Sequence, residues 1–241
     1  MCGITGYYAL SNNTLNNVIK VRQSTEKMYL RGPDCGDIYT HGKVALGHRR
    51  LSIIDTSNGA LQPMSDVTGR YTLAFNGEIF NYKELSAKYL AKVWERTGGP
   101  KTTSDTEVLL YLLIEHGKDC LGWLSGFFAF ALYDKQTGSM LLARDRYGKK
   151  PLNYYSTDEE FAFSSEMKSL LEWGIPKKLN YSVLHQYLQL NYIPQPQSMI
   201  EGVSKLKPAH YMLIDTAGIR EYKPYYQIKI DSAAYNTYTY E

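Results

Sequence analysis

The sequence predicts an α+β fold with four layers, in which two stacked sheets are flanked by helices on their outer faces. Two observations support this prediction. Strand-like segments alternate with helix-like segments along most of the chain. The segment FFAFALYD at residues 127–134 is almost continuously apolar, which is typical of a strand buried on both faces. Such a strand needs cover above and below, and two stacked sheets with outer helices provide it.

The first part of the chain is predicted to form a strand, a helix and a turn. Residues 3–10 are aromatic and β-branched, which favours a strand. A weak helical period then runs over residues 15–30. Glycine, proline and aspartate in RGPDCG at 31–36 end that helix in a turn.

Strand signals continue up to residue 80. KVALGHRRLSIID at 43–55 is predicted as two short strands with a bend at residues 48–49. YTLAFNGEIF at 71–80 is predicted as a strand that runs into Asn76-Gly77, a dipeptide that favours a tight turn.

Two helices are predicted next. The first covers residues 82–95 and ends before Gly-Gly-Pro. The second covers residues 105–116, and Ser104 and Glu107 have the spacing of a capping box at its start. Gly117 provides its C-terminal stop.

The segment after the apolar strand contains further turn and cap signals. Residues 139–155 are predicted as a strand, a turn around Gly148 and a second strand. Helices are predicted over 165–173 and 181–190, the second with Asn180 as its N-cap.

The composition and pattern of the sequence change after residue 190, so we expect one domain over 2–190 and a different segment over 191–241. This segment begins with the proline-rich NYIPQPQSM and continues with a possible hairpin around Ala217-Gly218. Its last residues, DSAAYNTYTYE, show no amphipathic pattern. They fit a linker toward a further domain, and a simple tail equally well.

Composition excludes several classes of protein. A net charge of +3 over 241 residues is too small to indicate a nucleic acid or membrane partner. No apolar run approaches the ~20 residues that span a bilayer, and the N-terminus lacks a secretory signal. Three widely spaced cysteines suit reduced thiols in the cytoplasm. The five histidines show no metal-ligand spacing with them, so no metal site is expected.

Cys2 is the first candidate for chemistry. Removal of Met1 would leave a thiol and a free α-amine on one residue. An α-amine with a pKa of ~7.7–8.0 can act as a general base near neutral pH. A cysteine thiolate is a strong nucleophile, so Cys2 could hold both groups. On Cys2 alone, chance remains the better explanation.

Neighbouring motifs make a catalytic role for Cys2 a better explanation than chance. The chain contains, in order, MCGITGYY, RGPD, LGHRRLSIID, FNGEIFNY, SDTEVLL, GFFAFALYD, LARDRYGKKPLNYY and FSSEMKSLL. This ordered set resembles the class II glutamine amidotransferase domain, an N-terminal-nucleophile hydrolase. It is most similar to the glutaminase half of glutamine-dependent asparagine synthetase, over residues 2 to about 226. The resemblance implies an αββα sandwich of two mainly antiparallel sheets.

The resemblance also implies a reaction. Cys2 would attack the side-chain amide of L-glutamine and form a γ-glutamyl thioester, its α-amine moving the proton to the released ammonia. The Asn76 side chain and the Gly77 N–H would stabilise the oxyanion. Without that context, Asn76-Gly77 is better explained as an ordinary hairpin turn.

Binding residues follow from the same resemblance. Arg50 would hold the α-carboxylate of glutamine, and Glu78 and Asp105 its α-ammonium. The main chain of Leu51, Ser52, Ile53 and Ile54 would line the same pocket. Asp105 has a structural alternative, because carboxylates are favoured in the first turn of a helix.

Other polar residues are interpreted as structural. His48 is not needed by this mechanism, and Arg49 is expected to pack or pair. Residues 31–34 are expected to form a turn that supports the site. The basic run RDRYGKK is expected to be a solvated hairpin, although phosphate binding is an alternative.

Synthetase motifs are absent from the sequence, which contains neither a Ser-Gly-Gly pyrophosphate loop nor a GxxxxGK[ST] motif. We therefore expect no cofactor for this domain, with ATP and magnesium used only in a partner synthetase domain that receives the ammonia. A homodimer is a further possible assembly. Two alternatives stay open: amidation of a carboxylate other than aspartate, and a glutamine-binding module without catalysis.

Overall fold

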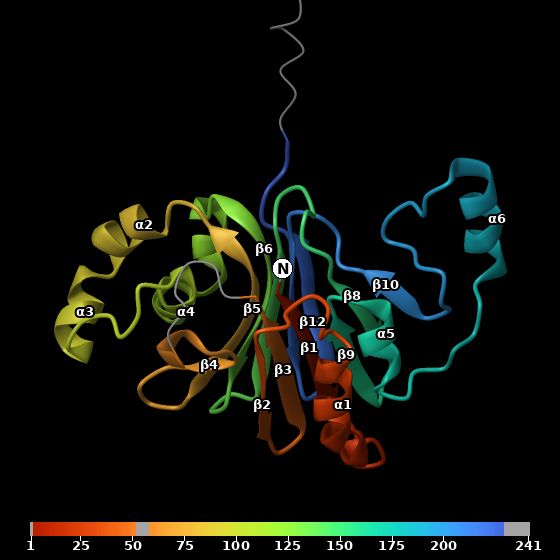
Figure 1. Ribbon diagram of the computed structural model, residues 1–241, viewed down its shortest axis with the longest axis horizontal. Coiled ribbons are helices and arrows are strands. Elements are labelled where there is room, and N and C mark those ends of the chain that lie inside the picture. The colour runs from red at the N-terminus through yellow and green to blue at the C-terminus, as the bar shows by residue number, and fades with distance from the viewer. Residues whose placement is uncertain (1, 52–57, 229–241) are drawn as a thin grey trace, which may run out of the picture.

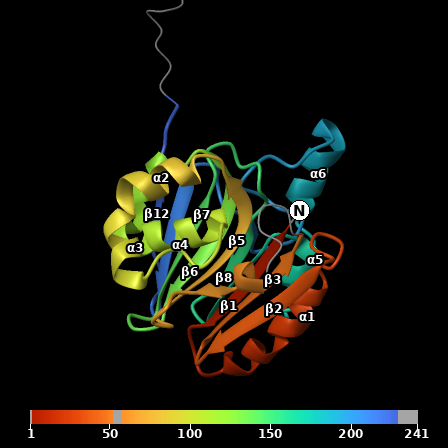
Figure 2. The same ribbon diagram turned by 60° about the vertical axis from the view of Figure 1, so that its left-hand side comes forward.

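The computed structural model describes residues 2–51 and 58–228. Two six-stranded sheets stack on each other, and helices cover their outer faces (Figures 1 and 2). All strand pairs within the two sheets are antiparallel. The predicted four-layer α+β sandwich is therefore confirmed.

The first sheet has the strand order β10-β8-β9-β1-β3-β2. Its strands, in chain order, are β1 (Gly3–Ala9), β2 (Cys35–His41), β3 (Val44–Arg50), β8 (Asn153–Ser156), β9 (Glu160–Ser164) and β10 (Val203–Lys205). The N-terminal strand thus lies in the interior of the sheet, between β9 and β3.

The second sheet has the strand order β12-β11-β7-β6-β5-β4. Its strands are β4 (Met64–Ser65), β5 (Tyr71–Ile79), β6 (Gly126–Asp134), β7 (Ser139–Arg144), β11 (His210–Asp215) and β12 (Gly218–Pro224). Because β4 is only two residues long, most of the outer edge of β5 has no strand partner among the described residues.

Helices form the two outer layers, and α6 stands apart from the body (Figure 1). Helices α1 (Val21–Glu26) and α5 (Met167–Leu171) cover the first sheet, whereas α2 (Tyr82–Tyr89), α3 (Ala91–Thr97) and α4 (Asp105–His116) lie beside the second. The remaining helical segments are η1 (Leu15–Lys20), η2 (Asn58–Ala60), η3 (Gly117–Trp123) and α6 (Tyr181–Leu190). Among the helices of the described ranges, none is long and apolar enough to cross a bilayer.

Strand β6 shows how the sequence builds the layers. Its phenylalanines Phe128 and Phe130 pack with Leu109 in the core beneath α4. Its alanines, Ala129 and Ala131, face the other way and pack in the core between the sheets. The strand is therefore buried on both faces, as predicted, and small side chains on the inner face let the two sheets approach closely.

Two predicted interruptions of strands are wrong. The expected bend at residues 48–49 does not form, because Val44–Arg50 is one continuous strand paired with β1 and β2. The expected turn at Asn76-Gly77 also does not form, because both residues pair in register with Ala129 and Phe128 of β6. The long partner strands override the local turn propensity.

Helix boundaries and four strands also differ from the predictions. The helix expected over 15–30 is a 3-10 turn followed by a short α-helix that ends at Glu26. The helix expected over 82–95 breaks at Leu90 into α2 and α3. Strands β2, β4, β9 and β10 were not predicted, because β2 is half exposed and lacks clear alternation, and the other three are short.

The segment 139–155 is not a hairpin, because β7 belongs to the second sheet and β8 to the first. Buried Arg144 holds the crossing: its guanidinium donates to the carbonyls of Gly148, Lys150 and Leu206 at 2.6, 2.7 and 2.6 Å. Asp145, also buried, accepts the N–H groups of the same loop. The basic run is therefore a fixed crossover, and the prediction of a solvated hairpin is wrong.

The C-terminal segment contributes strands to both sheets. The N-cap of α6 is confirmed, because Asn180 Oδ1 accepts the Val183 N–H at 3.1 Å. The hairpin around Ala217-Gly218 is confirmed as β11 and β12, and β11 continues the second sheet beside β7. The predicted linker residues 229–241 lie outside the described residues.

Candidate active site

Cys2 is held in place although it stands next to the chain end. It directly precedes β1, and the pairing of Gly3 with Arg49 brings it beside the end of β3. The Leu51 N–H lies 3.5 Å from Cys2 Sγ, and Sγ lies 3.6 Å from the Leu51 carbonyl. Arg31 Nε donates to the Cys2 carbonyl at 2.9 Å. These bonds fix the position of Cys2, so the chain does not fray at this residue.

The turn at residues 31–34 is hydrogen-bonded to the end of β3, beside Cys2. The Asp34 N–H donates to the Arg50 carbonyl at 3.1 Å, and Arg49 Nε donates to the Gly32 carbonyl at 2.8 Å. A Cβ on Gly32 would lie 2.3 Å from the Arg49 carbonyl carbon, so this close approach requires glycine. The geometry agrees with a supporting role for the turn and a structural role for Arg49.

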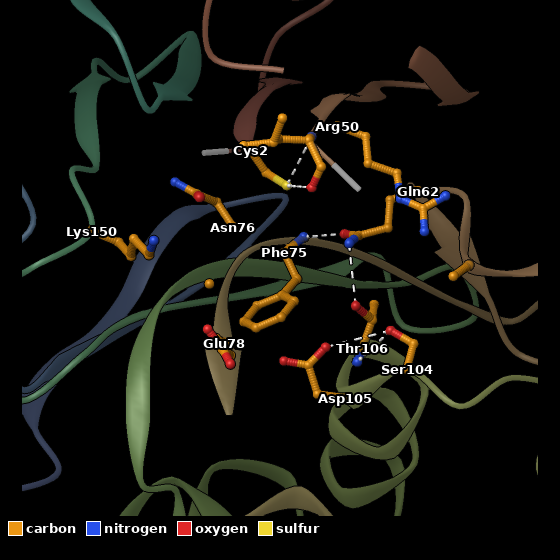
Figure 3. A pocket seen from close by; sticks show the side chains of 13 residues that line it. Cys2, Arg50, Gln62, Phe75, Asn76, Glu78, Ser104, Asp105, Thr106 and Lys150 are labelled. Carbon is orange, nitrogen blue, oxygen red and sulfur yellow. Dashed lines mark hydrogen bonds between the residues drawn. The ribbon is translucent and has the colours of Figure 1, made fainter. Parts of the chain in front are cut away.

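A pocket opens beside Cys2 and is lined by residues from both sheets and from α4 (Figure 3). The predicted site residues that it brings together are Cys2, Arg50, Leu51, Asn76, Gly77, Glu78 and Asp105. The predicted residues Ser52, Ile53 and Ile54 lie outside the described residues. Within residues 2–51 and 58–228, no group of three His, Cys, Asp or Glu side chains could hold a metal ion.

The outer edge of β5 forms one wall of the pocket, and alternate N–H groups point outward along it. The Phe75 N–H donates to Gln62 Oε1 at 2.6 Å, and the Ile79 N–H donates to Asp105 Oδ2 at 2.9 Å. Gly77 lies midway between them, so its N–H points the same way. No side-chain acceptor among the described residues takes it, which leaves this donor facing the pocket.

Gly77 is needed for packing. A Cβ at this position would lie 2.3 Å from the Phe127 carbonyl oxygen and 2.8 Å from Phe128 Cα. Any side chain would therefore push β5 away from β6. Glycine here serves the close approach of two strands, whereas the dipeptide alone suggested a turn.

Asn76 is fully buried, and its side chain lies near Cys2 in the pocket wall (Figure 3). Its Nδ2 is 3.5 Å from Ser165 Oγ, while its Oδ1 has no partner among the described residues. The Asn76 amide and the Gly77 N–H thus lie on adjacent residues beside the Cys2 thiol. This arrangement can stabilise negative charge that develops on a carbonyl oxygen attacked by sulfur.

The pocket is polarised. Glu78 and Asp105 lie together on the side of the pocket away from Cys2, and the Arg50 side chain also extends away from Cys2 (Figure 3). Burial raises the pKa of Asp105, and the nearby charge of Glu78 raises it further. Asp105 also occupies the first turn of α4, so both interpretations of this residue agree with its place. A zwitterionic amino acid has the charges to match this pocket.

His48 lies between the sheets instead of at the reacting centre. Its Nε2 is 3.1 Å from the Phe75 carbonyl, so Nε2 carries the proton and donates. Burial, together with the charges of Arg50 and Arg49, lowers the pKa of His48 to about 3. A neutral histidine that links β3 to β5 fits the structural role expected from the sequence.

Six residues that line the pocket were missed, the apolar Ala60 and Phe75 and the polar Gln62, Ser104, Thr106 and Lys150. Gln62 joins the edge of β5 to α4, because its Nε2 also donates to Thr106 Oγ1 at 3.3 Å. Ser104 caps α4 by accepting the Thr106 N–H at 3.1 Å, but Glu107 bonds to the N–H groups of Lys101 and Thr102 and completes no capping box. A capping signal marked Ser104, but nothing local marked Gln62.

Lys150 should tune the Cys2 thiol. Burial raises the Cys2 pKa, and the positive charges of Lys150 and Arg50 partly oppose this. The thiol is therefore mostly protonated at neutral pH, and its alkylation by iodoacetamide should accelerate as the pH rises through the raised pKa. In Lys150→Met the midpoint of that profile should move to higher pH.

Lys149→Met is the matched control, because Lys149 is exposed and places its Nζ over the ring of Phe127, at 5.2 Å. The backbone N–H groups of both lysines donate to the Asp145 carboxylate. Equal midpoints in the two variants and the unmodified chain would contradict the effect of Lys150.

Comparisons with known proteins indicate the family and the fold of this chain. The glutamine amidotransferase domain family matches residues 1–226. Asparagine synthetase [glutamine-hydrolyzing] 1 of Bacillus subtilis is 33% identical over 229 residues, covering 94% of this chain and 35% of the relative. Asparagine synthetase B of Escherichia coli is 39% identical over 173 residues, covering 71% and 30%. Glutamine phosphoribosylpyrophosphate amidotransferase of B. subtilis has a similar fold, with a TM-score of 0.64 at 20% identity over 94% of this chain and 50% of that one.

The fold and the family match identify this chain as an amidotransferase domain. The chain belongs to the glutamine amidotransferase domain family. It spans about a third of the length of the asparagine synthetases that it matches.

Proposed function

We propose that this domain hydrolyses L-glutamine to glutamate and ammonia through a thioester on Cys2, and that the ammonia serves asparagine synthesis. The observation that carries the proposal is the shared pocket of the Cys2 thiol, the outward Gly77 N–H and the Asn76 side chain. A nucleophile and two oxyanion donors, brought from different sheets, are the minimum set for acyl transfer from an amide.

The substrate would lie along the polarity of the pocket. The Arg50 guanidinium would pair with the α-carboxylate, and Glu78 and Asp105 would accept hydrogen bonds from the α-ammonium. The side-chain amide would then reach Cys2 with its oxygen toward Gly77 N–H and Asn76 Nδ2. Binding glutamine by its charged end leaves the chemistry to the uncharged end.

Hydrolysis would proceed in two halves. The Cys2 α-amine, free after removal of Met1, takes the thiol proton as sulfur bonds to the amide carbon. The same amine returns a proton to the nitrogen when the carbon–nitrogen bond breaks, and ammonia leaves. Water then attacks the thioester, and its proton restores the thiol as glutamate leaves. No metal or cofactor takes part in this scheme.

Use of the ammonia requires a partner. The asparagine synthetases that the chain matches are about three times as long, which supports a C-terminal synthetase domain as the recipient. ATP and magnesium would act in that domain. Release of ammonium without any acceptor would show that glutamine hydrolysis resides in this chain.

Asn76→Ala tests the oxyanion role. Loss of one preorganised donor costs ~2.7–4 kcal/mol of transition-state stabilisation, so the turnover of glutamine should fall by about a hundredfold or more. Ammonium release measured against glutamine concentration checks this. The control is Asn153→Ala, a buried asparagine of β8 outside the pocket, which should retain turnover. A fall of less than about threefold in Asn76→Ala would remove Asn76 from the oxyanion site.

A further inference from the structure

Ser165 occupies the contact between the two sheets behind the active site. It follows β9 directly and is almost fully buried. The Ile4 N–H donates to Ser165 Oγ at 3.0 Å, and the Ser165 N–H donates to the Ile4 carbonyl at 2.8 Å. These two bonds link Ser165 to Ile4 of β1, which lies two residues after Cys2.

The hydroxyl of Ser165 has a proton left to donate. Since Ile4 supplies the proton in its bond to Oγ, that bond uses only a lone pair of the hydroxyl. The other neighbour is the Asn76 amide, whose Nδ2 lies 3.5 Å from Oγ, at the far limit of a hydrogen bond. At the same time, the buried Asn76 Oδ1 lacks a partner among the described residues.

A half-turn of the Asn76 amide pairs the Ser165 hydroxyl with the Asn76 carbonyl oxygen and leaves the unpartnered end of the amide as a donor. It exchanges Oδ1 and Nδ2, so that the carbonyl oxygen meets the free hydroxyl proton and the NH₂ group takes the former place of Oδ1. A buried acceptor without a donor is costly, and the two ends of an amide differ only in their hydrogen bonding. The orientation that satisfies Ser165 therefore also frees Nδ2 to donate elsewhere.

We propose that Ser165 is a positioning residue, whose hydroxyl donates to Asn76 Oδ1 and thereby keeps Asn76 Nδ2 available to the oxyanion. The inference rests on the proposed glutaminase function, in which Asn76 is an oxyanion donor. Through its second bond, to Ile4, the same hydroxyl fixes the donor on β5 relative to the nucleophile before β1. One side chain thus sets both the direction and the place of the Asn76 donor.

Ser165→Ala should lower kcat for glutamine by about tenfold or more, with KM changed by less than about threefold, because the lost contact matters in the transition state. Ser164→Ala is the matched control. Ser164 is equally buried, and its hydroxyl donates to the Ile4 carbonyl at 3.3 Å and to Met28 Sδ at 3.6 Å, but among the described hydrogen bonds it has none with Asn76. Its kcat should stay within about threefold of the unmodified chain.

A double-mutant cycle separates positioning from simple loss of packing. If Ser165 acts through Asn76, then Ser165→Ala should change kcat by less than about twofold in the Asn76→Ala background. Additive losses, or equal losses in Ser164→Ala and Ser165→Ala, would overturn the inference. An unmodified chain that releases no ammonium would instead overturn the proposed function.

Neutron diffraction from deuterium-exchanged crystals of the unmodified chain gives an answer that does not depend on the variants folding. Deuterium on the amide atom that faces away from Ser165 is expected. Two deuterium atoms on the amide atom that faces Ser165 would overturn the inference, even if glutamine turnover were normal.

Discussion

Cys2→Ala is expected to lower glutamine hydrolysis by at least about 10⁴-fold while the chain keeps its fold, because removal of a nucleophile abolishes the covalent route. Among the described residues, the hydrogen bonds of the Cys2 thiol go only to the Leu51 backbone, so its loss breaks no other hydrogen bond. Ammonium release, together with a thermal unfolding curve, measures both expectations.

Cys35→Ala is the control for Cys2→Ala, since Cys35 is a partly exposed thiol outside the pocket. It should retain turnover and should still be labelled once by a diazo-ketone analogue of glutamine, as intact mass spectrometry would show. Normal turnover in Cys2→Ala would refute the covalent mechanism.

A variant with one extra residue before Cys2 should also be nearly inactive. The added residue converts the α-amine into an amide, which cannot act as a base, and a general base contributes ~10²–10⁴-fold to such reactions. The Cys2 thiol itself remains. We therefore expect turnover to fall by at least about a hundredfold, while alkylation of Cys2 by iodoacetamide continues.

The processed chain, beginning at Cys2 and confirmed by its intact mass, is the reference for this comparison. Acetylation of its α-amine provides an independent test, because it blocks the base without lengthening the chain. Full turnover of either the extended or the acetylated chain would exclude the α-amine as the base.

The sequence was sufficient where the signals are local. The apolar run that ends at Asp134, the cap at Asn180 and the glycine after His116 predicted elements that the structure contains. The layer arrangement followed from strands without a polar face, from the helices between groups of strands, and from the family resemblance. Such features depend on backbone hydrogen bonding and burial that involve only a few neighbouring residues.

Predictions failed where distant strands decide the local conformation. Asn76-Gly77 has the composition of a turn, but pairing with β6 keeps it extended. Lys150 reaches the pocket only because Arg144 and Asp145 hold the crossover between the sheets. The expected pocket residues were brought together, but their roles and those of residues 52–54 remain predictions.

The order of strands has a consequence for how the domain folds. The chain builds β1–β3 in one sheet, β4–β7 in the other, then returns to each sheet in turn. Neither sheet can be completed by a continuous stretch of sequence, so many pairings must wait for distant segments to meet. A folding intermediate in which only one sheet has formed would hold either the Cys2 thiol or the Gly77 N–H in its final position, but never both. Competence for chemistry can therefore arise only when the two sheets have docked.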